Sequence, residues 1–264
     1  MNLITKWWEN SPKSILRQLK SKLSNKVANP IWTKITGGPL NGSELFLDVN
    51  TFTGWNSMVT GEFDYFIYEK VKQNKNISDS IFWDIGAHFG YHSLSFASLN
   101  PVVSKVYSFE PNPFNAERLK KNVERNQNLS EKVIINQIAL SADDDVAKFK
   151  FSKSIDFSES SGSHLLGVEP PLSKANYSKF EELEVATRRI DSLINERIIE
   201  PAQIVKIDVE GAEMLVLKGG KAYFSKYKPL IFMEVHNITM MCEVSNYLHA
   251  IGYNIEIIDN ESSA

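Results

Sequence analysis

Short apolar runs alternate with helical segments along the chain from Ile81 onward. Runs that are apolar throughout are typical of strands buried on both faces, and helices between such strands are typical of a parallel sheet. We therefore expect an α/β, Rossmann-like domain: a mostly parallel, twisted sheet with helices on both faces. The predicted strands are residues 81–86 (IFWDIG), 106–110 (VYSFE), 133–140 (VIINQIAL), 147–151, 183–190 (LEVATRRI), 204–211 (IVKIDVEG), 229–236 (PLIFMEVH) and 254–259 (NIEIID).

Helix signals fall between these runs. The best-marked helix begins after Asn112, a capping residue, and Pro113, whose missing N–H costs nothing at the first helical position. A second helix is expected to be interrupted near Gly219 and Gly220. The predicted helices are residues 91–100, 113–127, 191–198, 211–227 and 241–252.

The first part of the chain has a different pattern. Residues 37–50 and the aromatic-rich stretch that ends at Tyr68 predict a hairpin followed by a helix. Ile15 to Leu23 has apolar residues at helical spacing among lysines, which fits packing on the domain better than lying on a membrane. We therefore divide the chain into an N-terminal extension of residues 1–76 (helix, hairpin, helix) that packs on the core, and a Rossmann-like domain of residues 77–264.

The turn after the first strand of that domain carries a ligand signal. A dinucleotide fold usually has the pattern G-x-G-x-x-G, but in residues 84–90 (DIGAHFG) His88 replaces the middle glycine, and Gly86 and Gly90 remain. A ligand without a pyrophosphate, such as S-adenosylmethionine, tolerates that loss. Glu110 ends the next predicted strand, where an acid accepts hydrogen bonds from the two hydroxyls of a ribose.

Composition and charge exclude several classes of binding partner and of protein. A net charge of -3 gives no basic field for nucleic acid. The single Cys242 allows no internal disulfide, which fits the cytoplasm, and no run approaches the roughly 20 apolar residues of a membrane span. The stretch from Ser152 to Ser178 is rich in Ser, Gly and Pro, which predicts a substrate-covering loop or a disordered insertion.

Several blocks resemble the FkbM family of methyltransferases: residues 82–97, 106–123, 137–144 and, above all, 205–220 (VKIDVEGAEMLVLKGG), followed by PLIFMEVH. The resemblance runs from about Gly38 to Asn237. It implies a class I methyltransferase fold, S-adenosylmethionine as methyl donor, and O-methylation, often of sugar or natural-product hydroxyls. With the motif analysis, it gives a set of expected donor-binding residues: Asp84, Gly86, Ala87, His88, Gly90, Glu110, Asn112, Ala139, Leu140 and Asp208.

The chain departs from the family at two points. His88 stands where relatives commonly carry Asn, which affects the local contacts of the donor. After NIEIID the fold expects a last antiparallel strand, but only residues 260–264 (NESSA) follow. This leaves open a truncation before the last strand, with the chain as one domain of a longer polypeptide.

The residues opposite the donor turn are candidates for catalysis. Transfer to an alcohol needs a base, and we expect His236 to serve, with Glu210 and Asp208 beside the reaction centre. Glu213 is expected to bind or orient the acceptor, and an exposed Trp55 would be a platform for a sugar. A strand-end histidine held by a backbone carbonyl is an equally good interpretation of His236.

Other functions stay open at this stage. Asp208, Glu210, Glu234 and His236 could collect magnesium or manganese, but without a compact ligand motif we predict no metal. Methyl-ester formation on a peptide or natural product, within a larger biosynthetic enzyme, is the main alternative, and a non-catalytic nucleotide-binding module is another. We expect a small-molecule or peptide acceptor, no nucleic acid, no stable membrane insertion, and either a homodimer or a fusion to a further domain.

Overall fold

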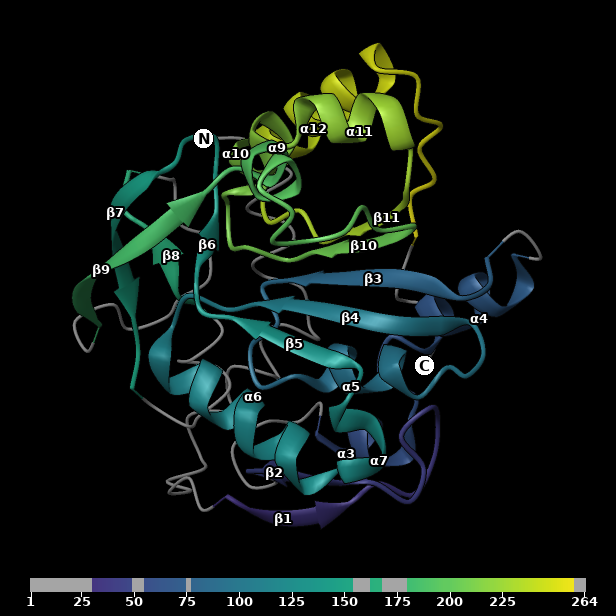
Figure 1. The fold of residues 1–264 in the computed structure, drawn as a ribbon. Coiled ribbons are helices and arrows are strands. Elements are labelled where there is room, and N and C mark those ends of the chain that lie inside the picture. The colour runs from purple at the N-terminus through teal and green to yellow at the C-terminus, as the bar shows by residue number, and fades with distance from the viewer. Residues whose placement is uncertain (1–29, 49–54, 75–76, 154–161, 168–179, 259–264) are drawn as a thin grey trace, which may run out of the picture.

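The computed structural model describes residues 30–48, 55–74, 77–153, 162–167 and 180–258. A five-stranded sheet, with every neighbouring pair parallel, forms its centre in the order β11-β10-β3-β4-β5 (Figure 1). Helices cover both faces, which confirms the α/β, Rossmann-like architecture. The strands are β3 (Ser80–Ile85), β4 (Val103–Phe109), β5 (Val133–Asn136), β10 (Ile204–Ile207) and β11 (Leu230–Met233).

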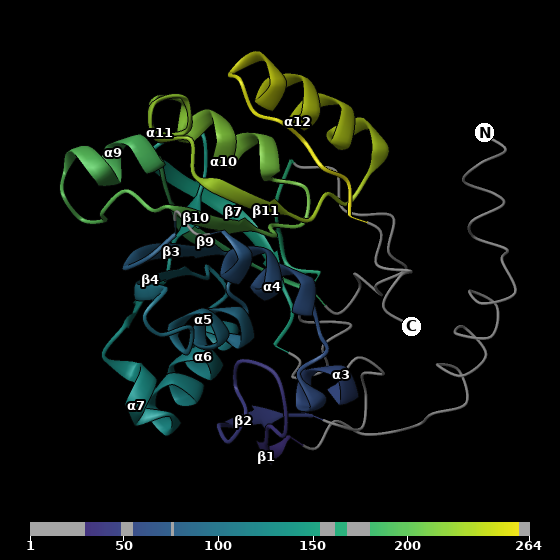
Figure 2. The ribbon, with the colours of Figure 1, turned by 90° about the vertical axis from the view of Figure 1, so that its right-hand side faces the viewer.

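Alternate residues of each strand enter different cores. In β3, Phe82 packs in the cluster on the side of α5 (Tyr91–Ala97), whereas Trp83 packs with the helices of the opposite face. In β10, Ile204 and Val205 divide in the same way. Two layers of helices therefore flank the sheet (Figure 2). The first contains α5, α6 (Pro113–Arg125) and α7 (Gln127–Ser130), and the second α9 (Ile190–Asn195), α10 (Glu213–Gly219), α11 (Lys221–Tyr227) and α12 (Ile238–Ala250).

The strand order reverses between β3 and β10. From β3 the sheet continues through β4 to β5 on one side and through β10 to β11 on the other. In open parallel sheets the crevice outside the carboxyl ends of the strands at such a switch point is the usual place for a ligand. This topology therefore places the turn after Ile85 and the turn after Ile207 next to each other.

A second sheet, in the order β6-β9-β7-β8, stands beside the first. The single strand expected over residues 133–140 is divided: β5 pairs with β4, whereas β6 (Ala139–Leu140) pairs with β9 (Glu181–Arg188). A period-2 pattern shows which residues are buried but not which sheet they join, so the sequence could not reveal the division. The remaining strands are β7 (Asp145–Phe151) and β8 (His164–Leu165).

The segment before residue 77 is part of the same core. β1 (Ile31–Lys34) and β2 (Glu44–Leu47) form an antiparallel hairpin, followed by α3 (Trp55–Thr60) and α4 (Tyr65–Gln73). The buried apolar side chains of β2, α3 and α4 belong to the cluster that contains Phe82. The helix predicted for residues 15–23 lies outside the described residues.

Asparagine side chains of α6 complete the outer edge of β2. The amide N–H of Phe46 donates to Oδ1 of Asn122 at 2.7 Å, and that of Glu44 donates to Oδ1 of Asn126 at 3.1 Å. Nδ2 of Asn126 donates in return to the Glu44 carbonyl at 2.8 Å. These amides satisfy backbone groups that a further strand would otherwise pair.

The end of the described chain differs from the prediction. Residues 254–258 form no strand after α12, so the strand predicted at 254–259 is wrong for the part that the structure describes. The predicted break between α10 and α11 at Gly219 and Gly220 is confirmed. Within the described ranges, no helix combines the length and the apolar character needed to cross a membrane.

Candidate active site

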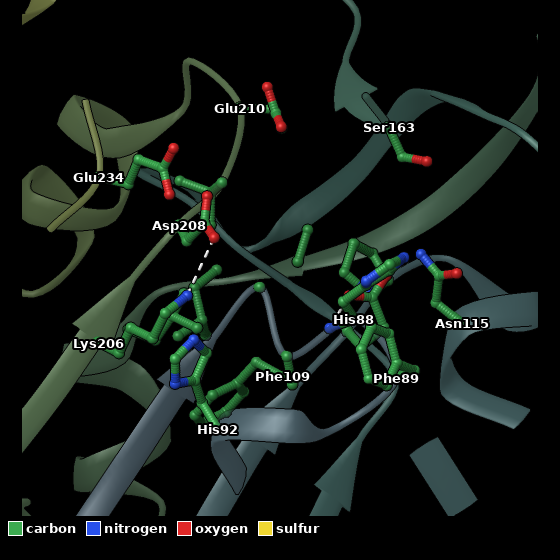
Figure 3. Close-up of a pocket in the computed structure, with 18 of the residues that line it drawn as sticks. His88, Phe89, His92, Phe109, Asn115, Ser163, Lys206, Asp208, Glu210 and Glu234 are labelled. Carbon is green, nitrogen blue, oxygen red and sulfur yellow. Dashed lines mark hydrogen bonds and ion pairs between the residues drawn. The ribbon is translucent and has the colours of Figure 1, made fainter. Parts of the chain in front are cut away.

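A cavity of about 740 Å³ opens at the carboxyl ends of β3, β4 and β10 (Figure 3). One end is lined by the turn after β3 and by β6, and the other by residues after β10 and β11. Among the predicted site residues, the cavity wall contains Gly86, Ala87, His88, Glu110, Ala139, Leu140, Asp208 and Glu210.

Backbone packing fixes the turn after β3. The amides of Gly86 and Ala87 both donate to the Phe109 carbonyl, each at 3.0 Å. Gly86 has φ +85°, and a Cβ there would stand 1.8 Å from the Asp208 carbonyl oxygen. Only glycine fits this position, because it combines a left-handed conformation with close contact to the neighbouring strand end.

Glu110 is held for hydrogen bonding toward the cavity. Oε2 accepts the backbone N–H of His88 at 2.8 Å, and Oε1 accepts that of Asn112 at 2.9 Å. A carboxylate has about four acceptor positions, and the Asn115 side chain also donates to Glu110, so the carboxylate keeps capacity for a ribose hydroxyl. Burial raises the pKa of Glu110 to about 7, against the two backbone donors, which lower it.

The remaining surface at this end suits a flat heterocycle. Ile138, Ala139 and Leu140 line it together with Phe109, the last residue of β4. Ser163 and Leu165, in the described part of the Ser-, Gly- and Pro-rich segment, line the cavity too, and the other residues of that segment are mostly outside the described ranges. This end therefore has an acid for a ribose and an apolar slot for a base.

Carboxylates gather at the opposite end. Asp208 Oδ1, Glu210 Oε2 and Glu234 Oε1 lie 3.6, 3.5 and 3.8 Å from Nε2 of His236. On its other side, Nδ1 of His236 lies 3.0 Å from Oε1 of Glu213, whose side chain is fully buried. Glu213 also accepts the Gly211 amide, so its contacts orient the imidazole.

The electrostatics assign different protonation states to these groups. Burial on its own would lower the pKa of His236, but Glu213, Glu210, Asp208 and Glu234 outweigh it and raise that pKa to about 9. Burial raises the pKa of Glu210 to about 8, and the imidazolium opposes this shift. At neutral pH His236 is therefore a cation, and Glu210 is the group poised to exchange a proton.

Three side chains at this end lie close enough together to hold a metal ion. One ligand atom each of Asp208, Glu234 and His236 lies within 4.8 Å of the others. Nζ of Lys206 donates to Oδ2 of Asp208 at 3.0 Å. His236 is protonated at neutral pH, so Asp208 and Glu234 already lie beside positively charged side chains.

Three predicted roles are corrected by burial. Trp55 is 1% exposed and packs on Phe89 with ring centroids 5.4 Å apart, so it is a core residue rather than a sugar platform. Asn112 is fully buried, and its side chain caps α6 and donates to the Ser152 carbonyl, so it supports the backbone beside Glu110 instead of lining the cavity. Glu213 contacts His236 and does not line the cavity.

Two further residues that were expected to bind the donor lie beneath the cavity surface. Asp84 is buried and accepts the Ser93 hydroxyl at 2.6 Å, and Gly90 begins α5 at φ +89°, with its α-carbon facing Leu119. Neither lines the cavity. His236 also lies outside its lining, three residues beyond the end of β11 at Met233.

Polar residues of the cavity wall that sequence reasoning missed include Asp64, His92, Asn115 and Lys206. A signal existed for Lys206, because it is a charged residue inside the buried run IVKI. Asp64 and His92 lie in segments whose pattern shows no ligand. Tertiary folding alone brings them to the switch point.

Comparisons with known proteins agree with this architecture. A family described as the methyltransferase FkbM domain matches residues 84–255, more than half of the chain. Hexuronic acid methyltransferase AglP of Haloferax volcanii is 28% identical over 141 residues, 53% of this chain and 50% of the relative. 2-O-methyltransferase NoeI of Sinorhizobium fredii is 28% identical over 153 residues, 56% of this chain and 60% of the relative.

The matches thus cover only part of these relatives, about half of one and three fifths of the other. Among solved structures, methyltransferase FkbM from Methylobacillus flagellatus aligns with a TM-score of 0.48 at 18% identity, over 74% of this chain and 46% of that one. The extent of the domain match decides the family. The chain belongs to the FkbM methyltransferase domain family.

Proposed function

We propose that this chain is an S-adenosylmethionine-dependent O-methyltransferase that acts on a hydroxyl of a sugar or natural product. The printed names of two relatives, a hexuronic acid methyltransferase and a 2-O-methyltransferase, support the reaction class. The observation that carries the proposal is a single cavity in which Glu110 stands at one end and Asp208 with Glu210 at the other. A nucleoside and a proton-accepting centre then share one enclosed space.

The described residues fit the donor. Glu110 would accept from the ribose with the acceptor capacity that its two backbone donors and the Asn115 side chain leave free, and Ala139 and Leu140 would pack on the adenine. The turn at Gly86 and Ala87 would bring the backbone close to the centre of the molecule. When bound, the donor supplies a methyl group on a sulfonium sulfur for in-line displacement.

Positioning and water exclusion would be the main contributions of the protein to such a displacement. An alcohol must also lose its proton as the new bond forms. We assign this proton to Glu210, because it lines the cavity and its pKa of about 8 is close to working pH. His236, as an imidazolium fixed by Glu213, would orient the carboxylates and stabilise the ionised form of Glu210.

The charge at this end favours a hydroxyl over the alternative acceptor. Three carboxylates, Asp208, Glu210 and Glu234, line the part of the wall where an acceptor would enter. Glu210 can take the proton that a hydroxyl must lose, whereas a carboxylate acceptor has no proton to give and would meet the ionised Asp208. Methyl-ester formation is therefore the weaker candidate.

Two measurements test the proposal. Titration calorimetry with S-adenosylhomocysteine should give a binding isotherm, and no heat at high protein concentration would defeat the donor site. Incubation with isotopically labelled donor and a host extract, followed by mass spectrometry, should identify a labelled ether. A labelled ester would favour the alternative, and loss of labelling after chelation by EDTA would overturn our prediction of a metal-free reaction.

A further inference from the structure

The cavity has a zwitterionic corner that the proposed catalytic groups leave unexplained. Lys206 and His92 line the wall together with the carboxylates of Asp64 and Asp208. Figure 3 shows Lys206, Asp208 and His92 gathered at one end of the cavity, away from His88 and Asn115. Groups of both signs therefore face one small volume.

Asp64 is held at this wall by a chain of buried contacts. Its Oδ2 lies 3.3 Å from Nε2 of His92, and Nδ1 of His92 lies 2.7 Å from the hydroxyl of Tyr68. A carboxylate can only accept, so with a neutral imidazole Nε2–H donates to Asp64 and Nδ1 accepts from the Tyr68 hydroxyl. Tyr68 is 1% exposed, which fixes the far end of the chain.

The carboxylate of Asp64 is not used to cap its own helix. Asp64 precedes α4 as its N-cap residue but makes no side-chain capping hydrogen bond. Its backbone is left-handed, with φ 49°. Since an N-cap Asp usually accepts from its own helix, the orientation toward His92 and the cavity needs another reason.

Lys206 provides the opposite charge. It follows Ile204 and Val205 in β10, and its side chain, 7% exposed, reaches the cavity and donates to Asp208 Oδ2 at 3.0 Å. Burial on its own would lower the pKa of Lys206, but Asp208, Asp84 and Glu234 outweigh it and raise the pKa above its usual value. The ammonium is therefore permanent at neutral pH.

We propose that Asp64 and Lys206 bind the amino-acid end of the donor, Asp64 through its α-ammonium and Lys206 through its α-carboxylate. This inference rests on the proposed function, because it requires S-adenosylmethionine in the cavity. The donor is a nucleoside joined at sulfur to a short zwitterionic chain. With the ribose at Glu110, that chain must continue past Gly86, where β3 and β10 end side by side.

Asp64 brings a segment outside the matched domain into the assignment. It precedes the part that matches the family, residues 84–255, and enters the cavity from the segment that also supplies Met58 and Phe63. The glycine turn at Gly86 would then hold the middle of the donor. The ends would belong to Glu110 on one side and to Asp64 with Lys206 on the other.

Paired ligands test this assignment. S-adenosylhomocysteine has the amino-acid end, whereas 5′-methylthioadenosine has the same nucleoside and a thioether without it. By calorimetry, Asp64→Asn should lower the affinity for S-adenosylhomocysteine about 10- to 100-fold, the effect expected for loss of a hydrogen bond to a charged group. The affinity for 5′-methylthioadenosine should not change. Lys206→Met should have the same selectivity.

Asp79→Asn is the matched control for Asp64. Asp79 is exposed and also left-handed, at φ 50°, and asparagine tolerates that conformation, so the control reports the cost of the substitution itself. Glu110→Gln should lower the affinities for both ligands by similar factors. Retained binding of 5′-methylthioadenosine shows that a variant has folded its nucleoside site.

The outcomes separate the two proposals. If the unaltered protein binds neither ligand, the proposed function fails. If it binds both and Asp64→Asn weakens both equally or neither, the assignment of Asp64 is wrong and the donor site stands. A variant with normal S-adenosylhomocysteine affinity but a raised KM for the acceptor would place Asp64 in acceptor binding, and this result also overturns the inference.

Discussion

Replacing Glu210 by Gln should remove the proton acceptor and keep the shape of the site. A positioned general base contributes about 10²- to 10⁴-fold to rate, or roughly 3 to 5 kcal/mol of transition-state stabilisation. Glu210 has a partly buried side chain, 16% exposed, so bulk water cannot readily replace it. We therefore expect kcat to fall by at least about 100-fold, with S-adenosylhomocysteine affinity within a factor of about three.

The pH dependence of kcat/KM of the unaltered protein should show the ionisation of Glu210. With a pKa of about 8, Glu210 is roughly one tenth ionised at pH 7, so kcat/KM should rise about tenfold for each unit below pH 8 and then level. The sulfonium of a bound donor favours the carboxylate form, so the midpoint in kcat should lie lower than that in kcat/KM.

The assay for both is transfer of labelled methyl from donor to the identified acceptor, at saturating and at limiting donor. Glu131→Gln, at an exposed carboxylate outside the cavity, is the control for the substitution. The assignment is refuted if Glu210→Gln keeps more than a tenth of the rate and the rising limb of the pH profile. Loss of activity together with loss of S-adenosylhomocysteine binding would instead indicate a disrupted site.

Three further outcomes follow from the described contacts. Gly86→Ala should lower Tm and donor binding far more than Gly42→Ala: both have positive φ, but a Cβ at Gly42 meets nothing within 4 Å, and equal losses of Tm would exclude the clash as the cause. Glu213→Gln should lower the pKa of His236 from about 9, because the lost charge and hydrogen bond favour the imidazolium; an NMR titration with an unchanged midpoint would contradict this. Burial raises the folded-state pKa of Glu110 to about 7 from its ordinary value of 4.5, so Glu110 binds its proton more tightly in the folded protein. The ligand-free protein should therefore lose up to about 3 kcal/mol of folding stability as pH rises from 4.5 to 7. Calorimetric unfolding over that range should show this slope, and Glu110→Gln should remove it; the same slope in the variant would assign it to other groups.

Local patterns sufficed for the donor half of the site. The turn with Gly86 follows a run of apolar residues that could only be a buried strand, and Glu110 follows the next run at the distance of one helix. Such strand-end positions are fixed by the order of elements along the chain, because parallel strands present their carboxyl ends at one edge. The sequence therefore predicted residues that line this end of the cavity, Gly86 and Glu110 among them.

The other half depends on contacts between distant segments. Asp64 is held at the cavity wall by His92, which in turn contacts Tyr68. These two contacts form because α4 packs against α5. The orientation of His236 depends on Glu213, which sequence reasoning placed at the acceptor. The aromatic pattern around Trp55 fits a core as well as a binding surface, and only burial distinguishes the two.

The asparagine contacts of β2 also set an order of events during synthesis. Glu44 and Asn126, which pair in the folded protein, are 82 residues apart. At a translation rate of about 5 to 20 residues per second, the hairpin emerges roughly 4 to 16 seconds before its partner helix. During that interval its edge has no α6 amides to pair with. The edge of β2 can therefore be completed only after Asn122 and Asn126 have been synthesised. We expect nascent chains halted before Asn122 to be the ones that chaperones retain.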